Sequence, residues 1–424
     1  MKSSLCFLLS FLGAAAFPTP IHHELANSSK AINGEYSRVE GDILVSDEEM
    51  KMTREKRGAP DVSDANRKWP LNQVISYKLV SSYEPAFAQN IRDAFKFWSD
   101  NTCLTYQEDG PTTPLIQVST GRGCSSQTGR QYNSATQKLY LDSGCNTVGT
   151  ILHEIAHSIG LGHTIMRSDR DSYVSINNNN IEKEGQVNFI KMTPQNNNNF
   201  GVEYDYTSVM HYFGEAFAID GAIPTIKALD ENAQSMMGQR TRAAFSDIKL
   251  VNLFYNCAQK CPFSTVNCQN GGIINSKTCN SCICPPMYSG SDCSQRTPSK
   301  GKYASSSCGA DLTATAAWQN VKGSFGVIAG EQYLDDPTSC YWNFKAPVGR
   351  KMEIRVNQID IWCDDSCAWN SVEFYMKGFA GGQYKFCCPE KFNGKVFKTP
   401  ENGASILVSS GYNITSINVD YRMI

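Results

Sequence analysis

Three histidines and one glutamate lie close together in this chain. The segment from His153 to His163 reads His-Glu-Ile-Ala-His-Ser-Ile-Gly-Leu-Gly-His. His153 and His157 are four residues apart, so on a helix they project from one face about one turn from each other. Gly160 can adopt a positive φ, which lets the chain leave the helix and turn to present His163. The spacing predicts three imidazole ligands for Zn²⁺, with a fourth position left for water.

Glu154 directly follows the first histidine and is placed to accept the proton of that water. The chain has six histidines, and two of them, His22 and His23, lie in a segment that we expect to be removed. Three of the remaining four therefore belong to this motif. A structural zinc site has four protein ligands and no general base, so the pattern favours a catalytic zinc site.

A helix must carry the first two histidines. Its apolar side is predicted by Val148, Ile151, Leu152, Ile155 and Ile159. Upstream, residues 74–80 alternate like a strand, and residues 85–98 have helical spacing with Ile91, Phe95 and Trp98 on one face. Residues 115–118 and 138–141 are further short strands. Two asparagine clusters, 177–180 and 196–199, predict long polar surface loops.

Composition limits the class of protein. A length of 424 residues indicates two or three domains. The 39 Lys and Arg residues almost balance the 41 Asp and Glu residues, giving a net charge of −2. Nucleic-acid-binding proteins usually show a strong positive excess, so no nucleic-acid partner is expected.

The beginning of the chain predicts export. Lys2 precedes an apolar run from Leu5 to Leu12, and Ala14-Ala15-Ala16 follows as a small-residue cleavage pattern. The run is far shorter than the roughly 20 apolar residues of a membrane-spanning helix, so a signal peptide over residues 1–16 is preferred to a membrane anchor. No membrane span is expected, and the product is expected to be secreted and extracellular.

Residues 17–57 are polar and contain no cysteine, and they end in Arg54-Glu55-Lys56-Arg57. In an exported chain this run predicts a propeptide that is cleaved after Arg57, although such runs are also common in solvated loops.

The cysteines fall into three groups. Of 17, one lies in the expected signal peptide. Four follow between Cys103 and Cys257, six between Cys261 and Cys293, and six between Cys308 and Cys388. Even groups in an exported chain predict three separately cross-linked domains. Counting alone leaves the pairings open, because six cysteines allow 15 of them.

The zinc motif and its surroundings resemble the astacin family of metzincin zinc metalloproteases. Arg167-Ser168-Asp169-Arg170-Asp171 is similar to the family's Arg-x-Asp-Arg-Asp stretch, and Ser208-Val209-Met210-His211-Tyr212 is similar to its Met-turn. Trp69-Pro70 resembles the start of the mature domain. The resemblance covers residues 58–258 and implies an α+β metzincin-like catalytic domain, with an upper sheet, a zinc helix and a Met-turn, that holds one Zn²⁺.

The resemblance also implies roles for single residues. Glu154 would be the general base, Tyr212 a further zinc ligand that swings to donate to the oxyanion, and Met210 an apolar floor below the imidazoles. It implies the disulfides Cys103–Cys257 and Cys124–Cys145.

Val39-Glu40-Gly41-Asp42 resembles the family's Phe-x-Gly-Asp latency motif, with valine in place of the aromatic residue. The Asp42 carboxylate would then occupy the position of the zinc-bound water in the zymogen. A simple Gly-Asp turn is the alternative. Thr164 stands where the family commonly has a glutamate that receives the new N-terminus, so burial of Gly58 after activation stays open.

Residues 259–296 resemble an EGF-like module, and a zinc ribbon is the weaker alternative because no Cys-x₂-Cys pair is repeated. The resemblance implies the pairs Cys261–Cys279, Cys268–Cys282 and Cys284–Cys293. Residues 305–424 contain alternating segments at 352–356, 371–376, 405–408 and 417–421, which predict a β-sandwich.

This last region resembles a CUB domain, which implies a Cys308–Cys340 bridge. Cys363, Cys367, Cys387 and Cys388 would form two more bridges with partners left open. Asn27 and Asn413 begin glycosylation sequons. No calcium site is predicted.

The sequence thus predicts a secreted zinc endopeptidase, made as a zymogen, that hydrolyses extracellular proteins such as matrix or tissue proteins. Protein contacts are expected through the EGF-like and CUB modules. The alternative is a catalytically silent extracellular binding or adhesion protein that keeps the protease fold. Glu154 and the three intact histidines argue against it.

Overall fold

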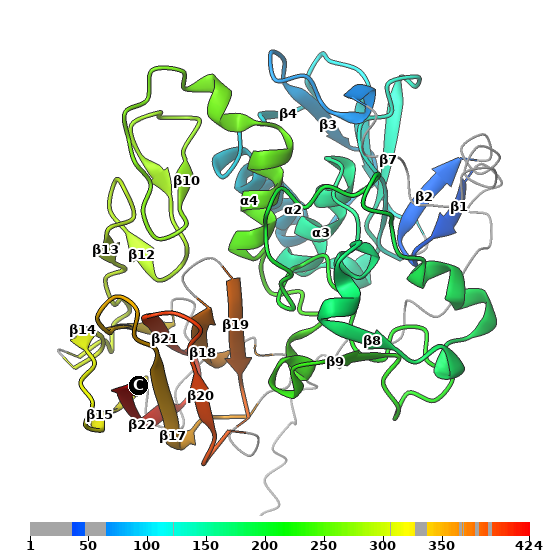
Figure 1. Cartoon of the computed structure of the whole chain (residues 1–424). Coiled ribbons are helices and arrows are strands. Elements are labelled where there is room, and N and C mark those ends of the chain that lie inside the picture. The colour runs from blue at the N-terminus through cyan, green and yellow to red at the C-terminus, as the bar shows by residue number, and fades with distance from the viewer. Residues whose placement is uncertain are drawn as a thin grey trace, which may run out of the picture.

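A computed structural model describes residues 36–46, 65–121, 123–305, 307–326, 337–363, 367, 369–377, 381–388 and 392–424. The expected signal peptide, Asn27 and the processing site at Arg57 lie outside these residues. Among the described residues, no helix is long and apolar enough to cross a membrane. Figure 1 shows an α+β unit, a small segment beside it and a C-terminal β-sandwich.

The α+β unit is built on a seven-stranded mixed sheet in the order β1-β2-β6-β7-β5-β3-β4. Its long helices are α2 (Pro85–Asp100), α3 (Val148–Ser158) and α4 (Phe245–Phe254). The helix over residues 85–98 and the strands near 74–80, 115–118 and 138–141 are confirmed. The strands are β1 (Tyr36–Val39), β2 (Ile43–Ser46), β3 (Ile75–Leu79), β4 (Tyr106–Glu108), β5 (Leu115–Ser119), β6 (Ser125–Gln127) and β7 (Thr136–Tyr140).

The core of this unit lies between α2, α3 and the sheet. Trp98 on α2 is fully buried, and its indole N–H donates to the carbonyl of Leu152 on α3 at 3.1 Å. Ile155 and Ile151 on α3 pack in the same cluster as the sheet residues. The helix that carries the first two histidines is therefore fixed along its apolar side by α2.

A second, smaller core lies below the sheet. It includes Tyr212 and Phe217, and residues of the antiparallel strand pair β8 (Val174–Ile176) and β9 (Ile226–Ala228) belong to it. The expectation of a purely surface role for the first asparagine cluster is wrong at Asn180. This side chain is buried because its amide donates to the carbonyls of Asp220 and Ile223, which satisfies two buried acceptors at once.

The small segment contains two short hairpins, β10 (Ile273–Ile274) with β11 (Cys282–Ile283) and β12 (Tyr288–Ser289) with β13 (Gln295–Arg296). It contacts both neighbours. Lys277 donates to the carbonyl of Leu104 in the α+β unit, and Arg296 donates to the carbonyl of Tyr341 in the sandwich.

The C-terminal region is a two-sheet sandwich, as expected of a CUB domain. One sheet has the order β14-β16-β21-β18-β19 and the other β15-β22-β17-β20. The core between them includes Phe344, Ile354, Phe374, Ile406 and Val419. The strands are β14 (Ala310–Thr313), β15 (Gln319–Gly326), β16 (Thr338–Lys345), β17 (Met352–Asp360), β18 (Asn370–Lys377), β19 (Gly381–Phe386), β20 (Val396–Lys398), β21 (Gly403–Ser410) and β22 (Ile414–Met423).

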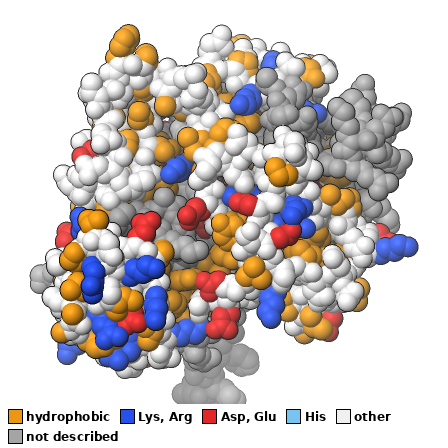
Figure 2. Space-filling view, viewed as in Figure 1, with side chains coloured by type: hydrophobic (Ala, Val, Ile, Leu, Met, Phe, Trp, Pro, Cys, Tyr) orange, Lys and Arg blue, Asp and Glu red, His pale blue; other side chains and the backbone are white. Residues whose placement is uncertain are grey.

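Lys and Arg side chains gather over this sandwich in the space-filling view (Figure 2). On the outer face of β17, β20 and β22, Arg422 and Lys398 flank Glu353, and Arg355 pairs with Asp420. The two carboxylates are far less exposed than the cations that cover them, so this face presents positive charge.

The structure joins all sixteen cysteines outside the expected signal peptide. In the α+β unit it contains Cys103–Cys257 and Cys124–Cys145, and in the small segment Cys261–Cys279, Cys268–Cys282 and Cys284–Cys293. In the sandwich it contains Cys308–Cys340, and it assigns the partners that the sequence left open as Cys363–Cys388 and Cys367–Cys387.

Replacing Trp98 by alanine tests this core. The change removes a fully buried side chain between α2 and α3, which costs about 3–5 kcal/mol. For a unit of this size the loss lowers the melting temperature by roughly 10 °C. Calorimetry of the Trp98→Ala chain should show this shift, whereas Val80→Ala, at a position that is 46% exposed, should leave the transition unchanged. Equal melting of both variants would contradict the packing.

Candidate metal centre

The zinc-motif helix begins and ends at residues suited to those positions. The Thr147 hydroxyl accepts from the amide of Thr150, which satisfies one free N–H in the first turn of α3. The helix ends at Ser158, and Gly160 has a φ of 102°. A Cβ at this position would lie 3.0 Å from the ring of Phe254, so both the backbone and the neighbouring ring require glycine. The chain then turns and brings His163 back toward the helix.

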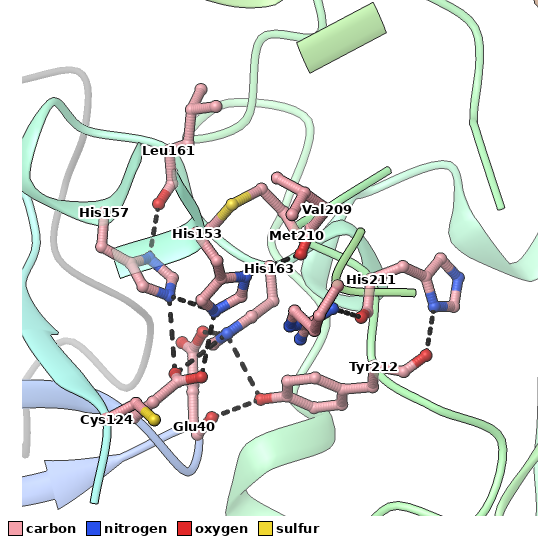
Figure 3. Close-up of polar contacts among 12 residues, drawn as sticks. Glu40, Cys124, His153, His157, Leu161, His163, Val209, Met210, His211 and Tyr212 are labelled. Atoms are coloured by element: carbon pink, nitrogen blue, oxygen red, sulfur yellow. Dashed lines mark hydrogen bonds and ion pairs between the residues drawn. The ribbon is translucent and has the colours of Figure 1, made fainter. Parts of the chain in front are cut away.

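The three predicted histidines point toward one another in Figure 3. Asp42 belongs to the same cluster. Their ligand atoms and one Asp42 oxygen all lie within 4.8 Å of one another, and all four residues are buried. Asp42 Oδ2 lies 3.0 Å from Nε2 of His153, and Oδ1 lies 3.0 Å from Nε2 of His163 and 3.5 Å from Nε2 of His157. Residues far apart in the sequence therefore supply one compact donor set.

The hydrogen bonds of the rings show that this donor set fits a cation. Nδ1 of His153 donates to the carbonyl of Val209 at 2.7 Å, and Nδ1 of His157 donates to the carbonyl of Leu161 at 2.8 Å. As neutral rings, both then carry a lone pair on Nε2, and these two atoms face each other at 3.1 Å. Nε2 of His163 and Oδ1 of Asp42 are also buried without a hydrogen-bond donor. Zn²⁺ takes such nitrogen and oxygen ligands, and the backbone carbonyls orient the rings for it.

Burial and charge shift the pKa of the carboxyl groups in opposite directions. Burial opposes ionisation of Asp42, but the positive charge of His163, with the nearby imidazoles of His153 and His157, holds its pKa well below the usual range. Burial, reinforced by the negative charge of Asp42, raises the pKa of Glu154 well above the usual range. One Glu154 oxygen is buried without a hydrogen-bond partner. Glu154 is therefore suited to exchanging a proton with a group that enters the site.

Asp42 reaches the site from a hairpin added to the edge of the sheet. β1 and β2 pair with each other, and β2 runs parallel to β6 of the α+β unit. The turn between them has Glu40 and Gly41 at positive φ, and the side chains of Glu40 and Asp42 both contact His163. Glu40 Oε2 lies 3.0 Å from Nδ1 of His163, and the Glu40 amide donates to Asn188. Sequence reasoning missed Glu40, although it stands in the same Glu-Gly-Asp turn.

Two residues of the predicted Met-turn, Met210 and Tyr212, lie beside the cluster. Met210 is buried in the main core, and Figure 3 shows it next to the histidine rings. The Tyr212 hydroxyl donates to the Glu40 carbonyl at 2.7 Å and lies 3.3 Å from Nδ1 of His163. His211 is separate from the cluster: its ring contacts the Tyr204 hydroxyl and the carbonyl of Tyr212.

Asp247 and Arg240 support the Met-turn, and the sequence alone did not identify either residue. Asp247 accepts from the amide of Val209 and the hydroxyl of Ser208, and burial raises its pKa to about 6. The guanidinium of Arg240 donates to the carbonyl of His211. Thr164, at the position where the resembled family commonly has a glutamate, donates to Ser208 and so joins this network.

The chain is similar to known zinc metalloproteinases. The family model described as astacin, a family of peptidases, matches residues 61–256. The chain is 33% identical over 401 residues to the zinc metalloproteinase nas-28 of Caenorhabditis elegans, covering 91% of this chain and 78% of the relative. It is 30% identical over 371 residues to the zinc metalloproteinase nas-27 of the same organism, covering 86% of each.

A solved structure of the high choriolytic enzyme 1, a hatching enzyme zinc-protease from the medaka fish Oryzias latipes, is 32% identical. It covers 46% of this chain and 96% of its own, with a TM-score of 0.41.

Zinc content provides the test of the donor set. The wild-type chain is expected to retain about one zinc ion per molecule after dialysis, measured by plasma mass spectrometry. His157→Ala removes one of three imidazoles and should lose nearly all of this zinc. His211→Gln changes a buried histidine outside the cluster and should retain it. Full zinc content in His157→Ala would contradict the assignment of ligands.

Proposed function

Since this chain belongs to the astacin family of zinc metallopeptidases, we propose that it is a secreted endopeptidase, made as a zymogen, that hydrolyses extracellular proteins. The observation that carries the zymogen proposal is the Asp42 carboxylate buried among three imidazoles. The proposed regions are a signal peptide at 1–16, a propeptide at 17–57 and a catalytic domain at 58–258. An EGF-like module at 259–296 and a CUB domain at 305–424 follow.

His153, His157 and His163 would hold the zinc ion. When bound, Zn²⁺ supplies Lewis-acid chemistry that polarises the scissile carbonyl and lowers the pKa of water. The Glu154 carboxylate accepts a proton from the attacking water and delivers it to the nitrogen of the leaving amine. Its burial supports this role, because the raised pKa allows the carboxyl to hold the proton between the two transfers.

Tyr212 is proposed to donate its phenolic hydrogen to the developing oxyanion. Burial raises the pKa of Tyr212 well above the usual value, so the hydroxyl keeps its proton and can act as a donor. In the described state this hydrogen goes to the Glu40 carbonyl. Removal of the propeptide would free it for substrate.

The propeptide turn is proposed to maintain latency at three points. Asp42 occupies the space among the imidazoles, Glu40 contacts His163, and the Glu40 backbone holds Tyr212. Cleavage after Arg57 followed by release of the β1–β2 hairpin would open all three. The loss of β2 from the edge of the sheet would also expose β6, against which an extended substrate can pair.

Secretion and an extracellular substrate are supported by the chemistry of the chain. Eight disulfides join the described cysteines, which fits an oxidising compartment. Asn413 lies in the turn between β21 and β22 and is partly exposed, which suits the proposed glycosylation there. Matrix or tissue proteins are the proposed substrates, by analogy with other secreted enzymes of this layout.

Replacement of Glu154 tests the catalytic role. Glu154→Gln keeps the shape of the side chain but removes its ability to accept a proton. We expect kcat/KM on a peptide substrate to fall by about 10²–10⁴ in the processed enzyme, with zinc content unchanged. Turnover at the wild-type rate would reject Glu154 as the base. Absence of turnover in processed, zinc-loaded wild type would instead favour the silent binding protein.

Latency is tested in the uncleaved chain. Asp42→Ala removes the carboxylate among the imidazoles, so the uncleaved variant should turn over peptide more than tenfold faster than uncleaved wild type. The matched variant Ser37→Ala, on β1 of the same hairpin, should stay latent. Cleavage after Arg57 should activate wild type and Ser37→Ala equally. Equal latency in Asp42→Ala and wild type would contradict the proposed switch.

A further inference from the structure

We propose that Glu373, in the C-terminal sandwich, is a positioning residue for the metal centre and acts through Arg242 on the loop beneath the Met-turn. The inference rests on the proposed endopeptidase function, which it extends to a residue outside the catalytic domain. It makes the sandwich a structural part of the active site as well as a module for outside contacts.

The ion pair joins the two units at a buried point. Arg242 donates to Glu373 at 2.6 Å, and the Glu373 side chain is only 1% exposed. Tyr375 and Ser371 also donate to this carboxylate, and Lys385 lies 4.0 Å from it. Burial opposes ionisation of Glu373, but the charge of Arg242 lowers its pKa, so the group is a buried anion. A buried carboxylate of this kind holds its cationic partner in a defined place.

Arg242 ends a short loop, Gln239–Arg242, that is bonded to the Met-turn. The Gln239 amide donates to the carbonyl of Thr207 at 2.7 Å and to that of Arg242 at 2.8 Å. Arg240 donates to the carbonyl of His211 at 3.1 Å. The loop therefore holds the chain at both ends of the Met-turn.

The same loop packs against the zinc-motif helix. A Cβ at Gly149, in the first turn of α3, would lie 2.0 Å from the Arg240 carbonyl oxygen, so helix and loop are in direct backbone contact. The Met-turn in turn accepts a hydrogen bond from His153 at Val209. A displacement of the loop thus reaches the metal ligands by two routes, one through α3 and one through the Met-turn.

Other contacts between the sandwich and the α+β unit involve residues outside the Gln239–Arg242 loop. Tyr384 donates to Asp230, and Lys395 donates to Asn232. Both acceptors belong to the segment around the short helix η7 (Glu231–Met236), which β19 contacts. Figure 1 shows β18 and β19 on the side of the sandwich that faces the α+β unit. These contacts fasten the same interface without reaching the loop, so Tyr384→Phe is a matched control.

The experiment uses the full-length, processed enzyme. Glu373→Gln keeps the volume of the side chain but removes the charge that holds Arg242. We expect kcat to fall about tenfold with KM changed less than twofold, because ligand geometry is disturbed and substrate contacts are not. The release of zinc to a chelator should accelerate about tenfold. Tyr384→Phe should match wild type in both measurements.

A double-mutant cycle tests whether Glu373 acts through Arg242. If Glu373 acts through Arg242, the variants Glu373→Gln, Arg242→Gln and their combination should show the same loss within twofold. Arg242→Lys keeps the charge and should recover most of the activity. Additive losses, a change in KM alone, or equal effects in Glu373→Gln and Tyr384→Phe would overturn the proposal.

Two further outcomes are distinguishable. If the melting curve shows that Glu373→Gln does not fold, Arg242→Lys is compared with Arg242→Gln instead. Equal rates of zinc release in these two variants would overturn the proposal. If wild type has no peptidase activity, the proposed function fails. The rates of zinc release still decide the positioning role.

Discussion

The structure depends on one arrangement of buried polar atoms, the meeting of three imidazole nitrogens with a carboxylate. Two of the nitrogens face each other at 3.1 Å with their lone pairs, because backbone carbonyls take the hydrogen on the opposite side of each ring. Without a cation this arrangement is repulsive. When a cation is bound, each hydrogen bond that orients a ring also orients a metal ligand. The Thr147 cap of the helix, the turn at Gly160 and the Met-turn all help to hold the three rings in this arrangement.

The parts of the site that follow local rules could be predicted from the sequence. The spacing of His153 and His157 fixes them on one helix face, and Gly160 marks the turn that returns the third ligand. The helix and strands near the site follow from periodicity in the same way. Bounds were less certain: the four segments predicted in the sandwich are all longer in the structure, because pairing with neighbouring strands extends them beyond the alternating core.

The features that could not be predicted from the sequence depend on tertiary contacts. Asp247 and Arg240 lie tens of residues from the zinc motif, and their own neighbourhoods carry no pattern that points to it. Glu40 stood within a motif but had no assigned partner until the hairpin was placed. The last two disulfides needed the positions of the sandwich strands. Asn180 was expected in a surface loop, but its side chain is buried because its amide donates to nearby carbonyls.

The position of Asp42 in the chain has a consequence for biosynthesis. Asp42 precedes the first zinc ligand by 111 residues, so during synthesis from the N-terminus it leaves the ribosome before any of the imidazoles. The carboxylate is thus already present, on the same molecule, when the helix folds. Under the proposed latency, the inhibiting group and the catalytic residues are made as one molecule, so inhibition needs no separate gene and no matched expression level.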